Sequence, residues 1–219
     1  MVEVGGRPVL EHNVRWLRSH GVREIAINTH HHAEVIERWL GDGSAFDVQV
    51  RYSREPELLG TSGALRPVHD FLRDGPFLVL HGGNLFDFDL RKLFDAHACS
   101  AAVATLSLYS PDTHEHAGDT GERVEMDRSG RVLRFVSAHV DTRLRMVDAG
   151  CYVLEPSLLQ HISADGPSHF ASDLFPLILR HQGILCGHVI DGSCLEIDTP
   201  AALARARELH ADELAGDRG

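Results

Sequence analysis

The period of hydrophobic positions changes repeatedly along the chain, which predicts helices and strands in alternation. Leu10, Val14 and Leu17 recur at helical spacing, and Gly21 follows where such a helix would end. Strict alternation of apolar and polar residues instead indicates a half-buried strand. Further helices are expected at 33–40, 63–72, 90–97, 155–162 and 171–181, and from Thr199 as N-cap onward. Strands are expected at 22–28, 46–52, 78–80, 101–108, 148–154 and within 184–197, with a hairpin at 122–136.

This order of elements favours an α/β fold. Strands that alternate with helices typically form a mostly parallel sheet with helices on both faces. The length of 219 residues fits one domain spanning 1–219, and 43% hydrophobic residues suffice for its core. We therefore expect one α/β domain without a linker or an internal repeat.

Composition narrows the partners. The formal net charge of −11 argues against nucleic acid, because phosphate backbones are bound by clustered Lys and Arg. No apolar run approaches the ~20 residues that a membrane span needs, and the N-terminus lacks a signal-peptide pattern. None of the 4 cysteines forms a C-x-x-C pair. We expect a reduced, cytoplasmic protein with neither a membrane nor a nucleic-acid partner.

Common catalytic motifs do not occur in the sequence. It contains no G-x-G-x-x-G after a strand, no G-x-x-x-x-G-K-[ST], no G-x-S-x-G and no H-E-x-x-H. These absences argue against a dinucleotide dehydrogenase, a P-loop NTPase, a serine hydrolase and a zinc protease of the usual kinds.

The stretch LVLHGGNLFDFDL, residues 78–90, has the pattern of an active-site edge. An apolar run leads into a glycine turn and then into polar and acidic residues. Buried strands deliver side chains in this way to the edge of a sheet, where α/β proteins bind ligands. The turn itself, Gly82-Gly83-Asn84, carries no carboxylate, which a site for phosphates and a metal would need.

Several segments together resemble the sugar-1-phosphate nucleotidylyltransferases, also called NDP-sugar pyrophosphorylases. They are VGGRPVLEHNVRWLRSHGVREIAINTHH, YSREPELLGTSGALRP, FLVLHGGNLFDFDL, DAGCYVLEPSLL, FASDLFPLIL and LEIDTPAALARA. They occur in the order of that family and cover nearly the whole chain. The resemblance implies a Rossmann-like three-layer α/β/α nucleotidyltransferase domain with a mixed sheet. It also implies that a sugar 1-phosphate attacks the α-phosphate of a nucleoside triphosphate and releases pyrophosphate, with Mg²⁺ as cofactor. Because family members often associate, a homo-oligomer stays open.

The resemblance assigns a nucleotide-binding segment. Glu57 and the turn Gly60, Thr61, Ser62 and Gly63 match the part of the family that holds the base and ribose. A turn of small residues at a helix start lets a ligand approach the backbone. The alternative is an ordinary loop before a helix.

The resemblance also assigns sugar and metal positions. Gly150 matches a sugar-facing position, with Asn84 as a second candidate; alternatively, Gly150 serves strand packing alone. Glu196 falls where the family places a metal-binding aspartate, and Asp198 follows at i+2, a spacing that shares one face of a strand. The alternative for Asp198 is to help Thr199 cap the last helix.

Three departures from the family affect catalysis. The opening strand and its G-x-G-T-R phosphate loop have no counterpart, so we expect the true protein to start upstream of Met1 and an inner strand position to lack its strand. Gly83 stands where the family has aspartate, and Ala138 where it commonly has lysine. The only lysine is Lys92, on a predicted surface helix. Two functions therefore stay open: a sugar-phosphate nucleotidyltransferase, or an inactive relative that binds nucleotide or sugar as a regulatory subunit.

Overall fold

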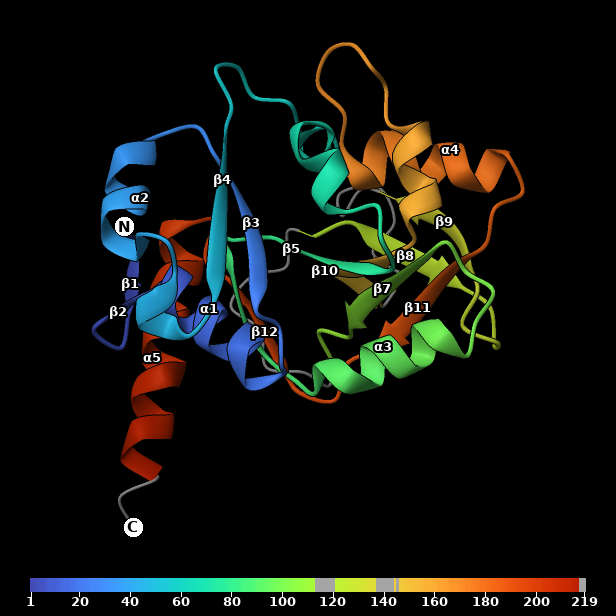
Figure 1. Ribbon diagram of the computed structural model, residues 1–219. Coiled ribbons are helices and arrows are strands. Elements are labelled where there is room, and N and C mark those ends of the chain that lie inside the picture. Colours follow the sequence, from blue (N-terminus) through green and yellow to red (C-terminus); the bar gives the residue numbers. More distant parts are fainter. Residues whose placement is uncertain (113–120, 137–143, 145, 217–219) are drawn as a thin grey trace.

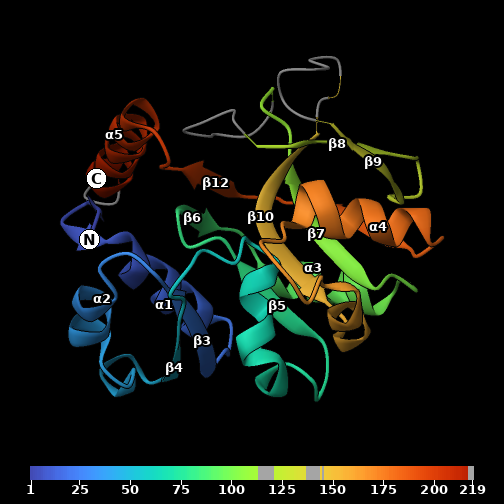
Figure 2. The ribbon, with the colours of Figure 1, turned by 90° about the horizontal axis from the view of Figure 1, so that it is seen from above.

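The computed structural model describes residues 1–112, 121–136, 144 and 146–216, with side chains of the last helix described to Leu209 (Figure 1). Position Ala138 lies outside the described residues. The central sheet has the strand order β11-β7-β10-β8-β9, and β5 also pairs with β10. Helices lie on both sides of this sheet in Figure 1 and Figure 2.

The elements alternate much as the hydrophobic pattern predicts. The strands are β1 (Glu3–Val4), β2 (Arg7–Pro8), β3 (Glu24–Thr29), β4 (Gln49–Arg54), β5 (Phe77–Leu80), β6 (Asn84–Asp87), β7 (Ala104–Tyr109), β8 (Arg123–Met126), β9 (Val132–Val136), β10 (Met146–Leu154), β11 (Leu185–Val189) and β12 (Ser193–Glu196). The α-helices are α1 (Val9–Ser19), α2 (Ala33–Leu40), α3 (Leu90–Ala98), α4 (Phe175–Arg180) and α5 (Pro200–Gly216). Shorter turns of helix are η1 (Ser44–Phe46), η2 (Gly63–Phe71), η3 (Pro156–His161) and η4 (Phe170–Leu174).

Strand β10 lies at the centre of the fold, because the side chains on its two faces pack into two separate hydrophobic cores. Tyr152 and Leu154 pack with η2, η3, η4 and α4, whereas Cys151 and Val153 pack with α1 and α3. Successive side chains of a strand point to opposite faces, so a continuous apolar run can fill both. The three-layer α/β/α arrangement implied by the resemblance is therefore confirmed.

The ladders are mixed, with fewer parallel pairs than the sequence led us to expect. In the described part of the chain, β3–β4 and β7–β11 are the parallel pairs. Strand β10 runs antiparallel to both β5 and β7, so β5, β7 and β11 all point the same way. The mixed sheet is thus confirmed, and the antiparallel insertion of β10 explains the low share of parallel ladders.

Strands β3 and β4 form a pair of their own. Within the described residues no backbone ladder joins β3 to β5, although Ile25 of β3 shares a hydrophobic cluster with Leu78 and Leu80 of β5. Strands β3 and β5 both line one cavity. We call the part of this cavity that lies between β3 and β5 the strand slot. Figure 1 and Figure 2 show β3 and β4 set apart from the sheet.

The structure also contains elements that the pattern did not indicate. Strand β6 (Asn84–Asp87) pairs antiparallel with β12. For these residues we had expected the polar turn to continue. Strands β1 and β2 form a short hairpin before α1.

The predicted cap of the last helix is confirmed, since the Ala202 N–H donates to Thr199 Oγ1 at 3.1 Å. None of the helices in the described residues combines the length and the apolar composition needed to cross a bilayer.

Candidate functional site

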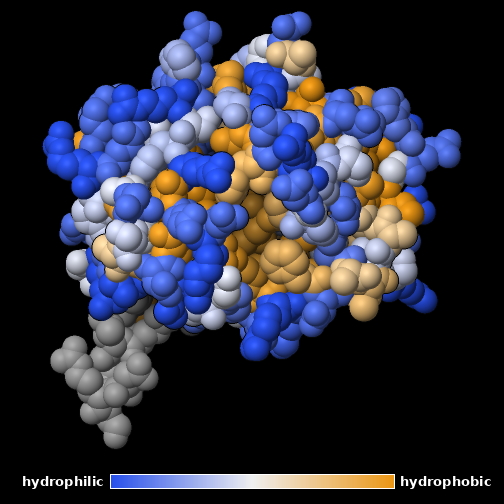
Figure 3. Space-filling view, in the orientation of Figure 1, coloured by the Kyte–Doolittle hydropathy of each residue, from blue (hydrophilic) through white to orange (hydrophobic). Residues whose placement is uncertain are grey.

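A single large cavity of about 1500 Å³ contains most of the site residues predicted from the sequence. It exceeds the ~300–1,000 Å³ of an ordinary ligand pocket, because it joins the strand slot to a polar region at the carboxyl end of β5. Figure 3 shows the hollow on this face, with hydrophobic residues around it. We call the polar region the acidic end; its carboxylates are Glu122, Asp148, Glu196 and Asp198.

Glu196 ends β12 and is buried, with 4% of its surface exposed. It lies opposite Asn84 in the β6–β12 ladder, and the Tyr109 hydroxyl donates to its Oε1 at 3.4 Å. Asp198, two residues further on, is exposed and borders the same cavity. The two predicted metal ligands therefore share one cavity but differ in burial.

Asp198 lies against the glycine turn after β5. A Cβ added to Gly83 would lie 2.8 Å from Asp198 Oδ1, whereas one added to Gly82 would meet no atom within 4 Å. The Ile197 N–H donates to the Gly83 carbonyl at 3.3 Å, which holds the two segments together. The carboxylate of Asp198 thus fills the space that a side chain at position 83 would need.

Asp148 is a site residue that the sequence analysis missed. It accepts hydrogen bonds from the Gly150 N–H at 2.9 Å and from the Tyr152 hydroxyl at 2.7 Å. Burial above all, together with the charges of Glu122 and Glu196, raises the pKa of Asp148 to about 6, although these two hydrogen bonds lower it. A lone carboxylate in the apolar strand VDAGCYVL was the available signal.

Gly150 is needed for a close approach as well as for its place in the cavity. It has φ +75° beside a register shift between β10 and β7, and an added Cβ would lie 2.6 Å from His81 Nδ1. Only glycine readily combines this conformation with this contact. The packing interpretation therefore has direct structural support, while Gly150 also borders the cavity.

His81 follows β5 and points its ring toward Tyr152, with ring centroids 5.5 Å apart. Burial lowers the pKa of His81, and the charge of Asp198 opposes this shift. In the described residues, its Nε2 is buried without a hydrogen-bond partner. A buried polar atom of this kind usually finds a partner, so a ligand in the cavity can supply one.

Asn84 is buried and ties β6 to β10 and to helix α1. Its Nδ2 donates to the Ala149 carbonyl at 3.0 Å, and its own carbonyl accepts from Asn13 Nδ2 at 2.8 Å. These bonds, made by the side-chain Nδ2 and the backbone carbonyl of Asn84, hold this residue in place at the acidic end.

The turn of residues 60–63 is docked onto Ser168. The N–H groups of Ser62 and Gly63 both donate to the Ser168 carbonyl at 3.0 Å, and the Ser62 and Ser168 hydroxyls are 2.7 Å apart. Gly60 has φ +79°, and an added Cβ would collide with the Ser168 carbonyl oxygen. The small residues of this turn therefore serve a close backbone approach within the protein, and Thr61 is the one that lines the cavity.

The loop before this turn places its two glutamates differently. Glu57 is exposed and does not line the cavity, whereas Glu55 is buried. The Glu55 carboxylate accepts from Asn28 Nδ2 at 2.9 Å and from the Leu59 N–H at 3.1 Å. Glu55 thus fixes the loop to β3, a structural role that no sequence pattern indicated.

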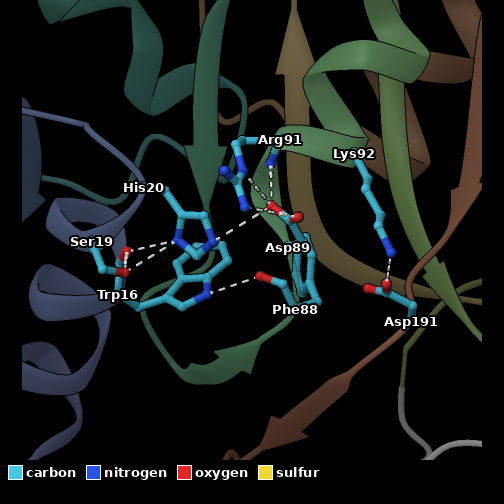
Figure 4. Close-up of polar contacts among 8 residues, drawn as sticks. All are labelled: Trp16, Ser19, His20, Phe88, Asp89, Arg91, Lys92 and Asp191. Carbon is cyan, nitrogen blue, oxygen red and sulfur yellow. Dashed lines mark hydrogen bonds and ion pairs between the residues drawn. The ribbon is translucent and has the colours of Figure 1, made fainter.

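Positive charge is missing from the cavity wall. Among the described lining residues there is no lysine or arginine. Lys92 pairs with Asp191, and the cluster around Asp89 in Figure 4 ties α1 to the start of α3. Asp89 caps α3 by accepting from the Arg91 N–H at 3.1 Å, and Trp16 Nε1 donates to the Phe88 carbonyl at 3.2 Å. These polar residues join α1, α3 and the segment after β11, and they are not among the described residues that line the cavity.

The donor set of the acidic end fits Mg²⁺. Carboxylate oxygens are its preferred protein ligands, and it commonly takes one or two of them while waters and substrate phosphates complete its shell. Glu196 and Asp198 match that requirement. Across the described residues no three His, Cys, Asp or Glu side chains form a metal-binding group, so a closed, all-protein metal cage is not built here.

The sequence is similar to those of known proteins. Residues 1–193 match the family model described as nucleotidyl transferase. A UTP–glucose-1-phosphate uridylyltransferase from Synechocystis is 30% identical over 82% of this chain and 49% of its own length. A mannose-1-phosphate guanylyltransferase from Mycobacterium tuberculosis is 30% identical over 94% of this chain and 56% of its own length. The chain thus spans about half the length of these curated relatives.

Solved structures support the same fold. A Bacillus anthracis protein solved in complex with a sucrose superposes with a TM-score of 0.83 at 20% identity, over 96% of this chain and 85% of that protein. The protein HddC from Yersinia pseudotuberculosis, complexed with GMP-PN, gives a TM-score of 0.78 at 20% identity over 95% and 88%. Together with the match over residues 1–193, these findings show that the chain belongs to the nucleotidyl transferase family.

Proposed function

We propose that this chain forms the nucleotidyltransferase part of a Mg²⁺-dependent sugar-1-phosphate nucleotidylyltransferase. The observation that carries the proposal is the acidic end of the cavity. It places Glu196 and Asp198 beside the turn after β5 in a chain whose relatives are named as uridylyltransferases and guanylyltransferases of sugar 1-phosphates.

In the reaction, a phosphate oxygen of the sugar 1-phosphate attacks the α-phosphorus of the nucleoside triphosphate. The bond from that phosphorus to the oxygen bridging to the β-phosphate breaks, and pyrophosphate leaves with the bond's electron pair. Bound Mg²⁺ would neutralise negative charge on the phosphates. Glu196 and Asp198 would hold the ion, and His81 Nε2 would hydrogen-bond a sugar hydroxyl. Glu57 and Thr61 remain our candidates for contacts to the nucleotide.

The strand slot accounts for the missing cations. We propose that an apolar strand from outside residues 1–219 fills it and brings a phosphate-binding loop with it. Two observations support this: β3 and β5 border the space without sharing a ladder, and Val14, Leu17, Ile25 and Leu78 line it with apolar side chains. A strand with apolar side chains on both faces would pair with both neighbours and remain buried.

A binding or regulatory role is the second candidate. The lack of lysine and arginine in the described cavity wall favours it, because triphosphates need cations around them. On this alternative the acidic end would still bind a sugar, while no pyrophosphate would form.

Pyrophosphate release decides between them. The assay pairs GTP or UTP with mannose or glucose 1-phosphate, with and without Mg²⁺. It uses residues 1–219 and the same chain extended by an apolar strand and G-x-G-T-R-type loop from a relative. We expect Mg²⁺-dependent release from the extended chain, reduced about a hundredfold or more by Glu196→Gln. No release from a folded, extended chain, with a nucleotide or sugar phosphate still raising its melting temperature, would favour the binding role.

A further inference from the structure

The contact between Gly83 and Asp198 carries a specific inference about the metal site. Related enzymes are expected to have a carboxylate at position 83, and here that position is glycine. The only atoms within 4 Å of a Cβ built on Gly83 belong to the carboxylate of Asp198, with Oδ1 at 2.8 Å. The carboxylate of Asp198, in the segment after β12, therefore occupies the space that a side chain at position 83 would use.

We infer that Asp198 replaces the carboxylate that the resemblance implies for position 83. The metal site then keeps two carboxylates, one of which lies in the segment after β12 instead of in the turn after β5. The inference rests on the proposed function for the identity of the ligand, a divalent cation. It assigns Asp198 as a metal ligand through its position rather than through sequence alignment.

Local geometry supports the transfer. The ladder pairs Glu196 with Asn84, and the bond from the Ile197 N–H to the Gly83 carbonyl extends this register to the next residue. Asp198, two residues after the end of β12, therefore lies directly beside the glycine turn. Its carboxylate can approach the Gly83 Cα only because no Cβ is present there. Gly83 thus leaves room for the Asp198 carboxylate in this position.

This arrangement changes what restoring an aspartate at position 83 would do. Gly83→Asp would place a Cβ at 2.8 Å from Asp198 Oδ1 and a second negative charge beside it. Because the Asp198 carboxylate is the exposed tip of a flexible side chain and can rotate aside, we expect a small loss of stability together with displacement of Asp198 from the turn. Asp198→Ala should remove both the steric and the electrostatic conflict, and the aspartate at position 83 should then supply the metal ligand.

Four variants of residues 1–219 test the inference: Gly83→Asp, Asp198→Ala, the double variant, and Gly82→Asp as a control on an open neighbouring position. In EDTA, Gly83→Asp should lower the melting temperature slightly more than Gly82→Asp does, through charge repulsion, and the double variant should recover the difference. Electron paramagnetic resonance of Mn²⁺ then gives the metal affinity. Asp198→Ala should weaken it about tenfold or more, and the double variant should regain it.

The inference is overturned if Asp198→Ala binds Mn²⁺ as tightly as the parent chain, or if the parent chain binds none. Equal losses of melting temperature from Gly83→Asp with and without Asp198 would also overturn it. Neither readout needs a substrate. If the Mn²⁺ pattern holds while the extended chain releases no pyrophosphate, the proposed function fails and the inference stands. If the extended chain releases pyrophosphate while Asp198→Ala binds Mn²⁺ as tightly as the parent chain, the inference fails and the transfer reaction stands.

Discussion

The two ends of the cavity are bounded in different ways. At the acidic end, side chains and backbone hold one another: Tyr109 donates to Glu196, Tyr152 to Asp148, and Asn84 to Ala149. At the strand slot, β3 and β5 face the space without a ladder between them in the described residues. Hydrogen bonds within the protein thus hold the acidic end, whereas none of the backbone ladders among the described residues crosses the strand slot. A chain can complete one half of a site independently of the other.

The largest expected effect compares two strand leucines. Leu106 of β7 is fully buried in the core, whereas Leu80 of β5 is half-buried and lines the cavity. We expect Leu106→Ala to lower the free energy of unfolding by about 4 kcal/mol, and Leu80→Ala by about 2 kcal/mol or less, because Leu80 already lacks neighbours on one side. Denaturant unfolding of both variants measures the difference. Equal losses would mean that the strand slot is packed as tightly as the core.

The next effect concerns the buried acid of the acidic end. The pKa of Asp148 is raised to about 6, above its unfolded value of about 3.9. The folded state therefore binds this proton more tightly, and the resulting stabilisation is present below about pH 4 and lost as the pH rises through about 6. The loss is on the order of 3 kcal/mol. Asp148→Asn should remove this part of the pH dependence between about pH 4 and pH 8 in equilibrium unfolding; parallel curves for the two proteins would contradict the assignment.

A smaller effect distinguishes glycines that the structure requires from those it does not. Gly60→Ala must accept φ +79° and a collision with Ser168, so we expect a loss of about 2 kcal/mol or more. Gly82→Ala meets open space and should change stability by about 0.5 kcal/mol or less. Thermal or denaturant unfolding of the pair tests whether the 60–63 turn is fixed by Ser168. A tolerated Gly60→Ala would show that the turn can move away from it.

The smallest effect is expected at the only lysine. Lys92 pairs with Asp191 at the surface, on α3 and away from the cavity lining (Figure 4). Lys92→Ala should leave the melting temperature almost unchanged, because exposed ion pairs contribute little, and should leave pyrophosphate release by an active chain unchanged. A strong loss of turnover in a variant of normal stability would show that the missing phosphate cation is Lys92 after all.

Much of the fold was predictable because the hydrophobic period is strong where cores are built. Helix 33–40 and the strand near 148–154 follow from apolar spacing alone, and Thr199 follows from capping chemistry. Strand β6 escaped prediction because Asn84 and Asp87 read as a turn, although pairing with β12 makes the segment a strand. Tertiary partners of this kind leave little trace in local sequence.

The site was predictable only as a set of positions. The sequence placed Thr61, Gly150, Glu196 and Asp198 in one region, and all of them line the cavity. It did not indicate that the N–H groups of the 60–63 turn are used by Ser168, because residues more than a hundred positions apart form that contact. It also treated Gly83 as a lost carboxylate, since only the three-dimensional approach of Asp198 shows what fills the space.

The most direct test of the account is amide hydrogen exchange in β3 and β5, measured for residues 1–219 and for the chain extended by an apolar strand and phosphate loop. We predict weak protection of the slot-facing amides in residues 1–219, and a rise of about a hundredfold or more in the extended chain, while protection in β7 and β10 changes little. Equal protection in both chains would contradict it, because the strand slot would then not be a vacant strand position.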